Sequence, residues 1–238
     1  MSASQAAGMP LVVAIDGPSG SGKSSVSRAV ATALDAAYLD TGAMYRALTW
    51  WCLDQGMDVT DREAVAAVAS SAPLEVGMDP DEPRIGVDGN DLTEEVRSVR
   101  VTEAVSAIAT NLDVRADMRR RQRALIAEGL AARGAVVAEG RDITTVVAPD
   151  APVRILLTAS EDARLARRAQ QDLGTADDGA KAATRDRVVA RDALDSTVSQ
   201  FTTAADGVVT IDSSQLDFAQ TVAAVLAVVA EARMPSGG

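Results

Sequence analysis

Residues 11–25 read LVVAIDGPSGSGKSS, and this stretch decides the fold. The apolar run from Leu11 to Ile15 predicts a buried strand, and a glycine-rich turn then leads into a helical pattern from Ser25 to Leu34. The turn fits the pattern GxxxxGK[S/T], which forms a phosphate-binding loop when it lies between a strand and a helix. The sequence therefore predicts a site for a polyphosphate tail, bound by loop amides and the helix N-terminus.

The loop predicts binding of ATP and Mg²⁺. We expect Lys23 to reach the β and γ phosphates and the Ser24 hydroxyl to coordinate Mg²⁺. The alternative is a glycine-rich turn that carries a lysine by chance, but the chain has only two lysines, Lys23 and Lys181. The expected ATP-binding residues are Gly17, Gly20, Ser21, Gly22, Lys23, Ser24 and Ser25.

Composition narrows the class of protein. The chain has 238 residues, of which 47% are hydrophobic, enough for a buried core. The apolar runs are too short for a bilayer and residues 1–9 lack a signal-peptide pattern, so we expect a cytoplasmic protein without membrane contact. One cysteine, Cys52, and no histidine exclude a disulfide framework and a Cys/His zinc site. A net charge of -11 argues against binding to a nucleic-acid polymer, whereas clustered arginines suit a small anion.

Further along the chain, the patterns predict an α/β fold with two added pieces. Core strands are expected at 36–39, 135–138, 153–157 and 208–211. Short antiparallel strands at 74–76 and 85–87, followed by a turn at 88–90, indicate an inserted β piece. The arginine-rich helical stretch between the last two core strands predicts a mobile lid. We expect a disordered leader at 1–9 and a frayed tail at 235–238.

These residues allow phosphoryl transfer to a small molecule. That reaction requires two anions held in line, with their repulsion cancelled by Mg²⁺ and arginines, so the lack of histidine is no obstacle. The chain has no NKxD, DxxG or LSGGQ-type signature, which argues against a regulatory GTPase and a transporter ATPase. Two hypotheses about the function are left: a kinase for a small molecule, and a nucleotide-binding module without turnover.

Five segments, in order, resemble the bacterial cytidylate kinases of the nucleoside monophosphate kinase group. They are GPSGSGKSS (17–25), DTGAMYRA (40–47), VRADMRRRQR (114–123), EGRDITTVV (139–147) and RDALDS (191–196). The resemblance implies a P-loop NTPase fold, with a five-stranded parallel sheet flanked by helices, an inserted small antiparallel β piece and a helical lid. It also implies transfer of the ATP γ-phosphate to CMP or dCMP by a monomer. A kinase for another monophosphate, or for a small metabolite such as shikimate, is the enzyme alternative.

The resemblance also implies a division of the chain and a set of site residues. The expected parts are the leader (1–9), a core with the P-loop (10–55), a monophosphate-binding insert (56–115), core (116–160), the lid (161–195) and core (196–234). Lys23, Arg141 and Arg191 would be catalytic. The expected substrate-binding residues are Thr41, Tyr45, Arg46, Ser106, Arg115, Arg141, Asp142, Arg191 and Asp195.

Base recognition has a physical basis beside the resemblance. Cytosine presents an N4 amino donor beside the N3 and O2 acceptors, so its site needs a carboxylate and one or two donors. Asp142, Arg115 and Ser106 supply that set. Two positions depart from the family pattern: Val198 replaces an arginine of the lid, and Glu139 stands where many relatives carry Asp.

Overall fold

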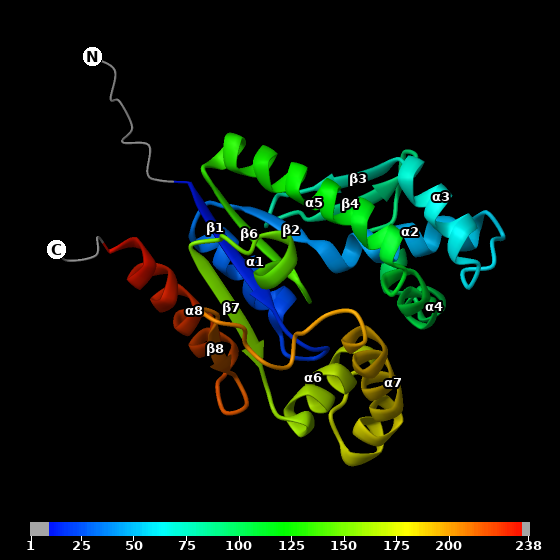
Figure 1. The fold of residues 1–238 in the computed structure, drawn as a ribbon. Helices are drawn as coiled ribbons and strands as arrows, with labels where there is room; N and C mark the ends of the chain where they lie inside the picture. The colour runs from blue at the N-terminus through cyan, green and yellow to red at the C-terminus, as the bar shows by residue number, and fades with distance from the viewer. Residues whose placement is uncertain (1–9, 235–238) are drawn as a thin grey trace.

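The fold is organised around a five-stranded parallel sheet with the strand order β2-β6-β1-β7-β8 (Figure 1). This computed structural model describes residues 10–234, so the expected leader (1–9) and tail (235–238) lie outside the described residues. The predicted parallel sheet is confirmed. Its strands are β1 (Leu11–Asp16), β2 (Ala37–Asp40), β6 (Ala135–Gly140), β7 (Val153–Thr158) and β8 (Val209–Asp212).

Helices cover both faces of the sheet, because successive side chains of a strand point to opposite faces. In β1, Val13 and Ile15 pack with one helical layer and Ala14 packs with the other. The first layer contains α1 (Lys23–Ala33) and α8 (Phe218–Arg233), and the second contains α2 (Thr41–Asp54) and α5 (Leu112–Arg133). Because all five strands are parallel, the polar residues at their carboxyl ends lie at the same edge of the sheet. Ligands bind at this edge in open α/β folds.

The inserted β piece is a small antiparallel sheet of three strands, β3-β4-β5. The prediction of two strands with a turn at 88–90 was incomplete, because Asn90 already belongs to the third strand. Asp88 and Gly89 both have positive φ angles, 51° and 74°, which is the backbone of a two-residue hairpin turn. The elements of this region are α3 (Arg62–Ser71), β3 (Leu74–Gly77), β4 (Arg84–Val87), β5 (Asn90–Asp91), η1 (Glu95–Arg97) and α4 (Val99–Ala109).

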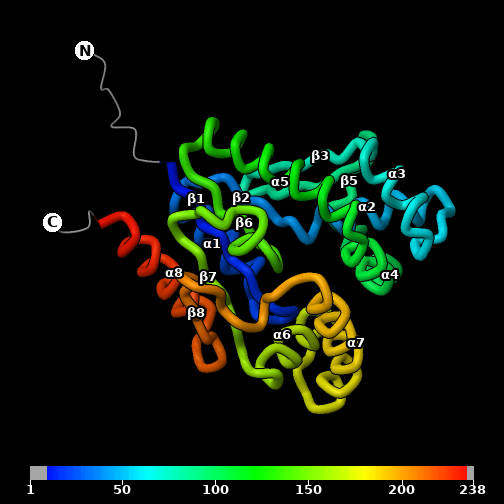
Figure 2. The backbone as a smooth tube through the Cα atoms, in the orientation of Figure 1, coloured from blue at the N-terminus to red at the C-terminus, as the bar shows by residue number. Residues whose placement is uncertain are grey.

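The lid consists of two helices, α6 (Glu161–Leu173) and α7 (Asp178–Ser196), which lie side by side next to the P-loop (Figure 2). Ser160 and Asp177 cap their N-termini through side-chain oxygens. Gly174 ends α6 in the left-handed conformation, with a φ angle of 74°, which favours glycine. Within residues 10–234, no helix is both long and apolar enough to span a bilayer.

Several element boundaries differ from the sequence prediction in ways that affect the site. Helix α1 begins at Lys23 rather than Ser25, so Lys23 and Ser24 lie in its first turn. Strand β6 extends to Gly140 instead of ending at Ala138, which places Glu139 within the sheet. A π-helical turn, η2 (Ile143–Val147), follows directly after Asp142.

Candidate active site

The P-loop joins the carboxyl end of β1 to the N-terminus of α1. Gly20 adopts a φ angle of +78°, and a Cβ there would lie 2.5 Å from the carbonyl oxygen of Arg164, so only glycine fits. Among residues 10–234, the backbone amides of residues 22–25 donate no hydrogen bond to protein. The Ser21 hydroxyl is buried and also has no partner within that part of the chain. The loop thus offers a group of unused donors at a helix N-terminus, an arrangement that binds phosphate.

Lys23 lies beside two carboxylates at the ends of neighbouring strands. Its Nζ is 4.0 Å from Oε2 of Glu139, and Asp40 is the register partner of Glu139 in the sheet. Burial and the neighbouring Asp40 raise the pKa of Glu139 to about 7, whereas Lys23 and the Ser24 hydroxyl lower it. Burial also lowers the pKa of Lys23. A lysine, a hydroxyl and two acidic groups therefore converge next to the loop.

Four arginines gather between Lys23 and the lid: Arg46, Arg141, Arg168 and Arg191. Burial lowers the pKa of Arg191, and so do the positive charges of Arg46, Arg141 and Arg168. Nε of Arg191 is buried without a hydrogen-bond partner among the described residues. Because guanidinium groups stay protonated in proteins, such a cluster favours an anion between them.

Two of the three residues expected to read the base, Arg115 and Asp142, meet at the carboxyl end of β6. Nη2 of Arg115 donates to Oδ2 of Asp142 over 2.6 Å, and both side chains are largely buried. The Ser106 hydroxyl donates to Asp195 over 3.2 Å. Burial and the charge of Asp142 raise the pKa of the Tyr45 hydroxyl, which places Tyr45 beside the same pair. Tyr45 of α2 and Arg115 of α5 thus lie beside Asp142, whereas Ser106 of α4 contacts Asp195 of α7.

Two other expected site residues have structural contacts of their own. The Thr41 hydroxyl donates to the Glu139 carbonyl oxygen over 2.8 Å and is buried, so it fastens α2 to β6. A Cβ at Gly17 would lie 2.3 Å from the carbonyl oxygen of Leu157, so this glycine lets the loop approach β7 closely. Ser25, in contrast, is exposed on α1.

The lid contacts the P-loop through residues that sequence reasoning left open. Nη1 of Arg164 donates to the Ser19 carbonyl oxygen over 2.9 Å, and Nη1 of Arg167 donates to the Ser21 carbonyl oxygen over 3.1 Å. Arg168 instead donates to Asp172 on its own helix over 3.1 Å. Arg164 and Arg167 therefore fasten α6 to the loop.

Sequence reasoning missed Asp192. Its carboxylate accepts from the Ser19 amide over 3.2 Å and from Arg164 over 2.5 Å, and it pairs with Arg141 at 3.0 Å. Its position next to Arg191 in RDALDS was the available signal. Asp192 connects the lid to both the P-loop and the end of β6.

Asp16, immediately before the P-loop, was also missed. Its carboxylate accepts from the amides of Ile143 and Thr144 over 2.9 and 2.8 Å, and from the Thr144 hydroxyl over 2.6 Å. Burial raises the pKa of this carboxyl to about 6. Asp16 thus fixes the turn η2, which directly follows Asp142.

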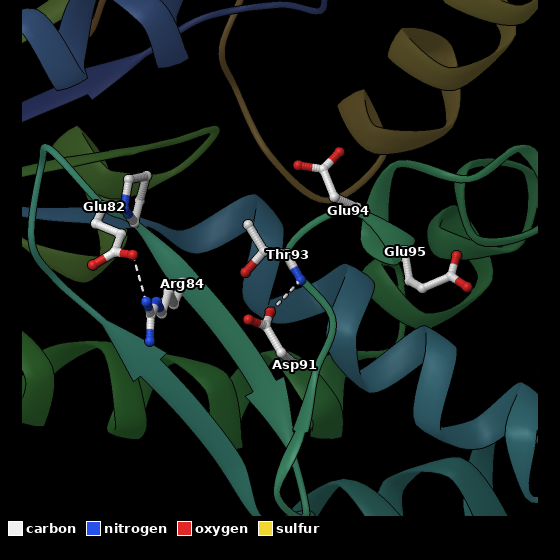
Figure 3. Close-up of a pocket in the computed structure, with 7 residues that line it drawn as sticks. Glu82, Arg84, Asp91, Thr93, Glu94 and Glu95 are labelled. Carbon is white, nitrogen blue, oxygen red and sulfur yellow. Dashed lines mark hydrogen bonds and ion pairs between the residues drawn. The ribbon is translucent and has the colours of Figure 1, made fainter.

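A hollow on the insert does not fit the same chemistry (Figure 3). Its carboxylates outnumber its one arginine, and Arg84 already pairs with Glu82. The hollow is therefore unsuited to a phosphate group. Its lining residues are Glu82, Pro83, Arg84, Asp91, Thr93, Glu94 and Glu95.

A phosphate-binding loop on a parallel sheet, with a buried lysine and convergent arginines, defines a P-loop phosphotransferase. The sequence profile of the cytidylate kinase family matches residues 13–231. The chain therefore belongs to the cytidylate kinase family.

Curated relatives from three bacteria carry the name cytidylate kinase. The Streptomyces avermitilis protein is 46% identical over 224 residues, covering 94% of this chain and 94% of the relative. The Nocardia farcinica protein is 48% identical and covers 93% and 94%, and the Cutibacterium acnes protein is 47% identical and covers 92% and 96%. Among solved structures, a gluconokinase from Sinorhizobium meliloti 1021 is 18% identical with a TM-score of 0.45 and covers 94% of each chain, a likeness too distant to bear on function.

Proposed function

We infer that this protein transfers the γ-phosphate of ATP to CMP or dCMP, giving ADP and CDP or dCDP. The observation that carries this inference is the Arg115–Asp142 pair, which adjoins Arg141, the arginine that would hold the acceptor phosphate. A carboxylate can accept from cytosine N4, and a guanidinium can donate to N3 or O2. Uracil would turn its O4 acceptor toward Asp142, so an oxygen of a buried carboxylate would face another acceptor instead of a donor.

The acceptor phosphate belongs among the arginines. Arg46 and Arg141 would hold it, and Arg191 would lie between the acceptor and the moving phosphoryl group. The positive charges of Arg46 and Arg141 lower the pKa of Arg191, which supports the assignment of all three to one anion site. Because a phosphate oxygen is already an anion near neutral pH, the acceptor needs no strong general base. Asp195, which accepts from the Ser106 hydroxyl, would accept from the ribose hydroxyls.

The residues beside the P-loop fit a magnesium ion. Ser24 would bind it directly, and Glu139 is suited to accept from a water of its coordination shell. The Ser24 hydroxyl already lowers the pKa of Glu139, which supports this placement. Within residues 10–234 no group of three acidic, cysteine or histidine side chains forms a complete metal site. Mg²⁺ would be held mainly by phosphates and waters, and it would add positive charge beside the β and γ phosphates.

The chain divides by task in this proposal. Residues 10–55, 116–160 and 196–234 would form the ATP-binding core, residues 56–115 the monophosphate-binding insert, and residues 161–195 the lid. The Ser106–Asp195 contact supports the division, because it joins the insert to the lid across the acceptor site. We propose that the protein works as a monomer, with the ATP site and the acceptor site on one chain.

An acceptor panel tests the proposed function. ADP production from ATP and Mg²⁺ is measured with CMP, dCMP, UMP, AMP, GMP, TMP and shikimate in turn. We expect strong stimulation by CMP and dCMP alone. If another acceptor wins, the base-reading roles of Asp142, Arg115 and Ser106 are wrong. If no acceptor stimulates ADP release, the protein is a nucleotide-binding module.

A matched pair of variants tests the base-reading role directly. Asp142→Asn replaces one carboxylate oxygen by an amide donor, so the variant loses the acceptor for cytosine N4 and can donate to uracil O4. We expect the ratio of kcat/KM for CMP over UMP to fall by about 100-fold or more. Asp150→Asn, in the loop before β7, is the control and should keep the wild-type ratio.

A further inference from the structure

One short segment touches two of the arginines assigned to the acceptor, Arg115 and Arg141. Residues 197–201 follow α7 directly and lead away from the lid. Ser199 contacts Arg115, and Phe201, which is fully buried, contacts Arg141. Neither Ser199 nor Phe201 belongs to the phosphate-binding loop or to the residues assigned to the substrate.

The Ser199 contact completes a three-point support of Arg115. Nη2 of Arg115 donates to the Ser199 hydroxyl over 2.7 Å and to Asp142 over 2.6 Å. Nη1 donates to the carbonyl oxygen of Ala109, at the end of α4, over 3.1 Å. The three acceptors come from different segments, so together they fix the plane of the guanidinium group. Ser199 is the one side chain besides Asp142 among these three supports of Arg115.

The Phe201 contact supports Arg141 from its flat face. Cζ of Arg141 lies 4.4 Å from the centre of the Phe201 ring, within the range of a cation–π interaction. The edge of the same guanidinium faces two lid carboxylates: Nη2 is 3.0 Å from Asp192, and Nη1 is 2.9 Å from Asp195. Nη1 lacks the alignment of a hydrogen bond to Asp195. The ring is therefore a main constraint on the tilt of Arg141.

We propose that Ser199 and Phe201 are positioning residues: Ser199 orients Arg115 for base discrimination, and Phe201 orients Arg141 for the acceptor phosphate. This inference rests on the proposed function. The two roles differ because the two arginines face different ends of the acceptor nucleotide. Since the segment continues from α7, which carries Asp192 and Asp195, docking of the lid helix and alignment of the two arginines occur together.

The test for Ser199 is base discrimination. In Ser199→Ala, Arg115 keeps its charge but loses one support, so we expect the kcat/KM ratio of CMP over UMP to fall by about 5- to 10-fold. The KM for ATP should stay at the wild-type value. Ser199→Thr keeps the hydroxyl and should restore the ratio. A role in stability alone would change the melting temperature without changing this ratio.

The test for Phe201 weakens the attraction between the ring and the Arg141 guanidinium while keeping an aromatic ring at this position. The chain has two phenylalanines, Phe201 and Phe218, and Phe218 is exposed at the start of α8. In a Phe218→Leu background, Phe201 is therefore the one phenylalanine that an analogue replaces. Incorporation of 3,4,5-trifluorophenylalanine depletes the ring face of negative charge. We expect the KM for CMP and for UMP to rise together, by about 2- to 30-fold, with their ratio unchanged.

The outcomes separate this inference from the proposed function. Wild-type protein that shows no preference for CMP contradicts the proposed function before any variant is compared. Where wild type prefers CMP, a Ser199→Ala ratio within twofold of wild type overturns the role of Ser199. A fluorinated protein with unchanged KM for both acceptors overturns the role of Phe201.

Discussion

Lys23 is the side chain whose loss should affect phosphoryl transfer most. It lies in the first turn of α1, and its ammonium group faces Glu139 at 4.0 Å. In Lys23→Ala, the charge expected at the β and γ phosphates is lost, and we predict a fall in kcat of about 100- to 1000-fold. CMP binding, measured by calorimetry, should change little, because arginines hold the acceptor. Lys181→Ala, at the other lysine of the chain, is the matched control and should stay active.

Asp16 predicts a pH-dependent stability. Its pKa is raised from 3.8 to about 6 by burial, so its protonated form is favoured in the folded state. The stability that this group contributes is therefore present below pH 3.8 and is lost as the pH rises through 6. An asparagine does not titrate. The free energy of unfolding of wild type minus that of Asp16→Asn should decline with rising pH, by on the order of 3 kcal/mol at most over the whole transition.

Urea unfolding at several pH values between about 5 and 8 checks this prediction. The loss of hydrogen bonds in Asp16→Asn shifts all points by a similar amount, so the slope with pH is the relevant quantity. A constant difference would show that Asp16 keeps an ordinary pKa in the folded protein, and a difference that grows with pH would show a lowered pKa; either result contradicts the prediction.

Residues in short local motifs could be predicted from the sequence, whereas residues that act on distant segments could not. Lys23 and Ser24 follow from one eight-residue pattern. Asp16 acts on a turn 127 residues away, and Ser199 acts on Arg115 across 84 residues. No local spacing encodes such contacts, because they exist only after the strands and helices have assembled.

At the scale of elements, α5 packs unusually closely on the sheet. A Cβ added at Gly129 would lie 2.7 Å from Cγ2 of Val136 and 3.0 Å from Cβ of Ala37, on neighbouring strands. Gly129→Ala should gain up to about 1 kcal/mol in helix propensity. Overpacking against two stiff strands costs about 1–3 kcal/mol, so we predict a net loss of stability of about 1–2 kcal/mol.

Thermal unfolding of Gly129→Ala measures this loss. The exposed neighbour Glu128→Ala lies on the same helix and exchanges one good helix former for another, and it adds no atom at the sheet. Gly129→Ala should melt a few degrees below wild type, and Glu128→Ala at or above it. A stabilised Gly129→Ala protein would mean that α5 moves outward at little cost.

The elements themselves were largely predictable, and their ends were not. The apolar runs identified the core strands, because buried strands are rich in apolar residues, and the arginine-rich stretch between the last two strands was predicted to be helical. The end of β6 was misplaced because Glu139 and Gly140 are polar or small, yet both are buried by tertiary contacts. The third strand of the insert, β5, has two residues, too few for an alternating pattern.

In the whole molecule, Asp192 connects three parts of the chain. It joins α7 to the P-loop, to α6 through Arg164 and to the end of β6 through Arg141. In Asp192→Asn these charged contacts are weakened, so we predict that trypsin cleaves residues 161–196 several-fold faster, with the core unaffected.

Asp186→Asn, an exposed change on the same helix, provides the comparison for this proteolysis. It should be cleaved at the wild-type rate. Equal cleavage of all three proteins within the lid would show that Asp192 does not hold the lid to the core.

The proposed reaction is tested most directly by following the phosphate itself. ATP labelled at the γ position is incubated with Mg²⁺, CMP and the protein, and the labelled products are separated by chromatography, with Lys23→Ala as control. If the protein transfers the γ-phosphate to CMP, the label will appear in CDP, and Lys23→Ala will transfer little of it. Label released as inorganic phosphate, or retained in ATP while CMP is present, would contradict transfer to CMP.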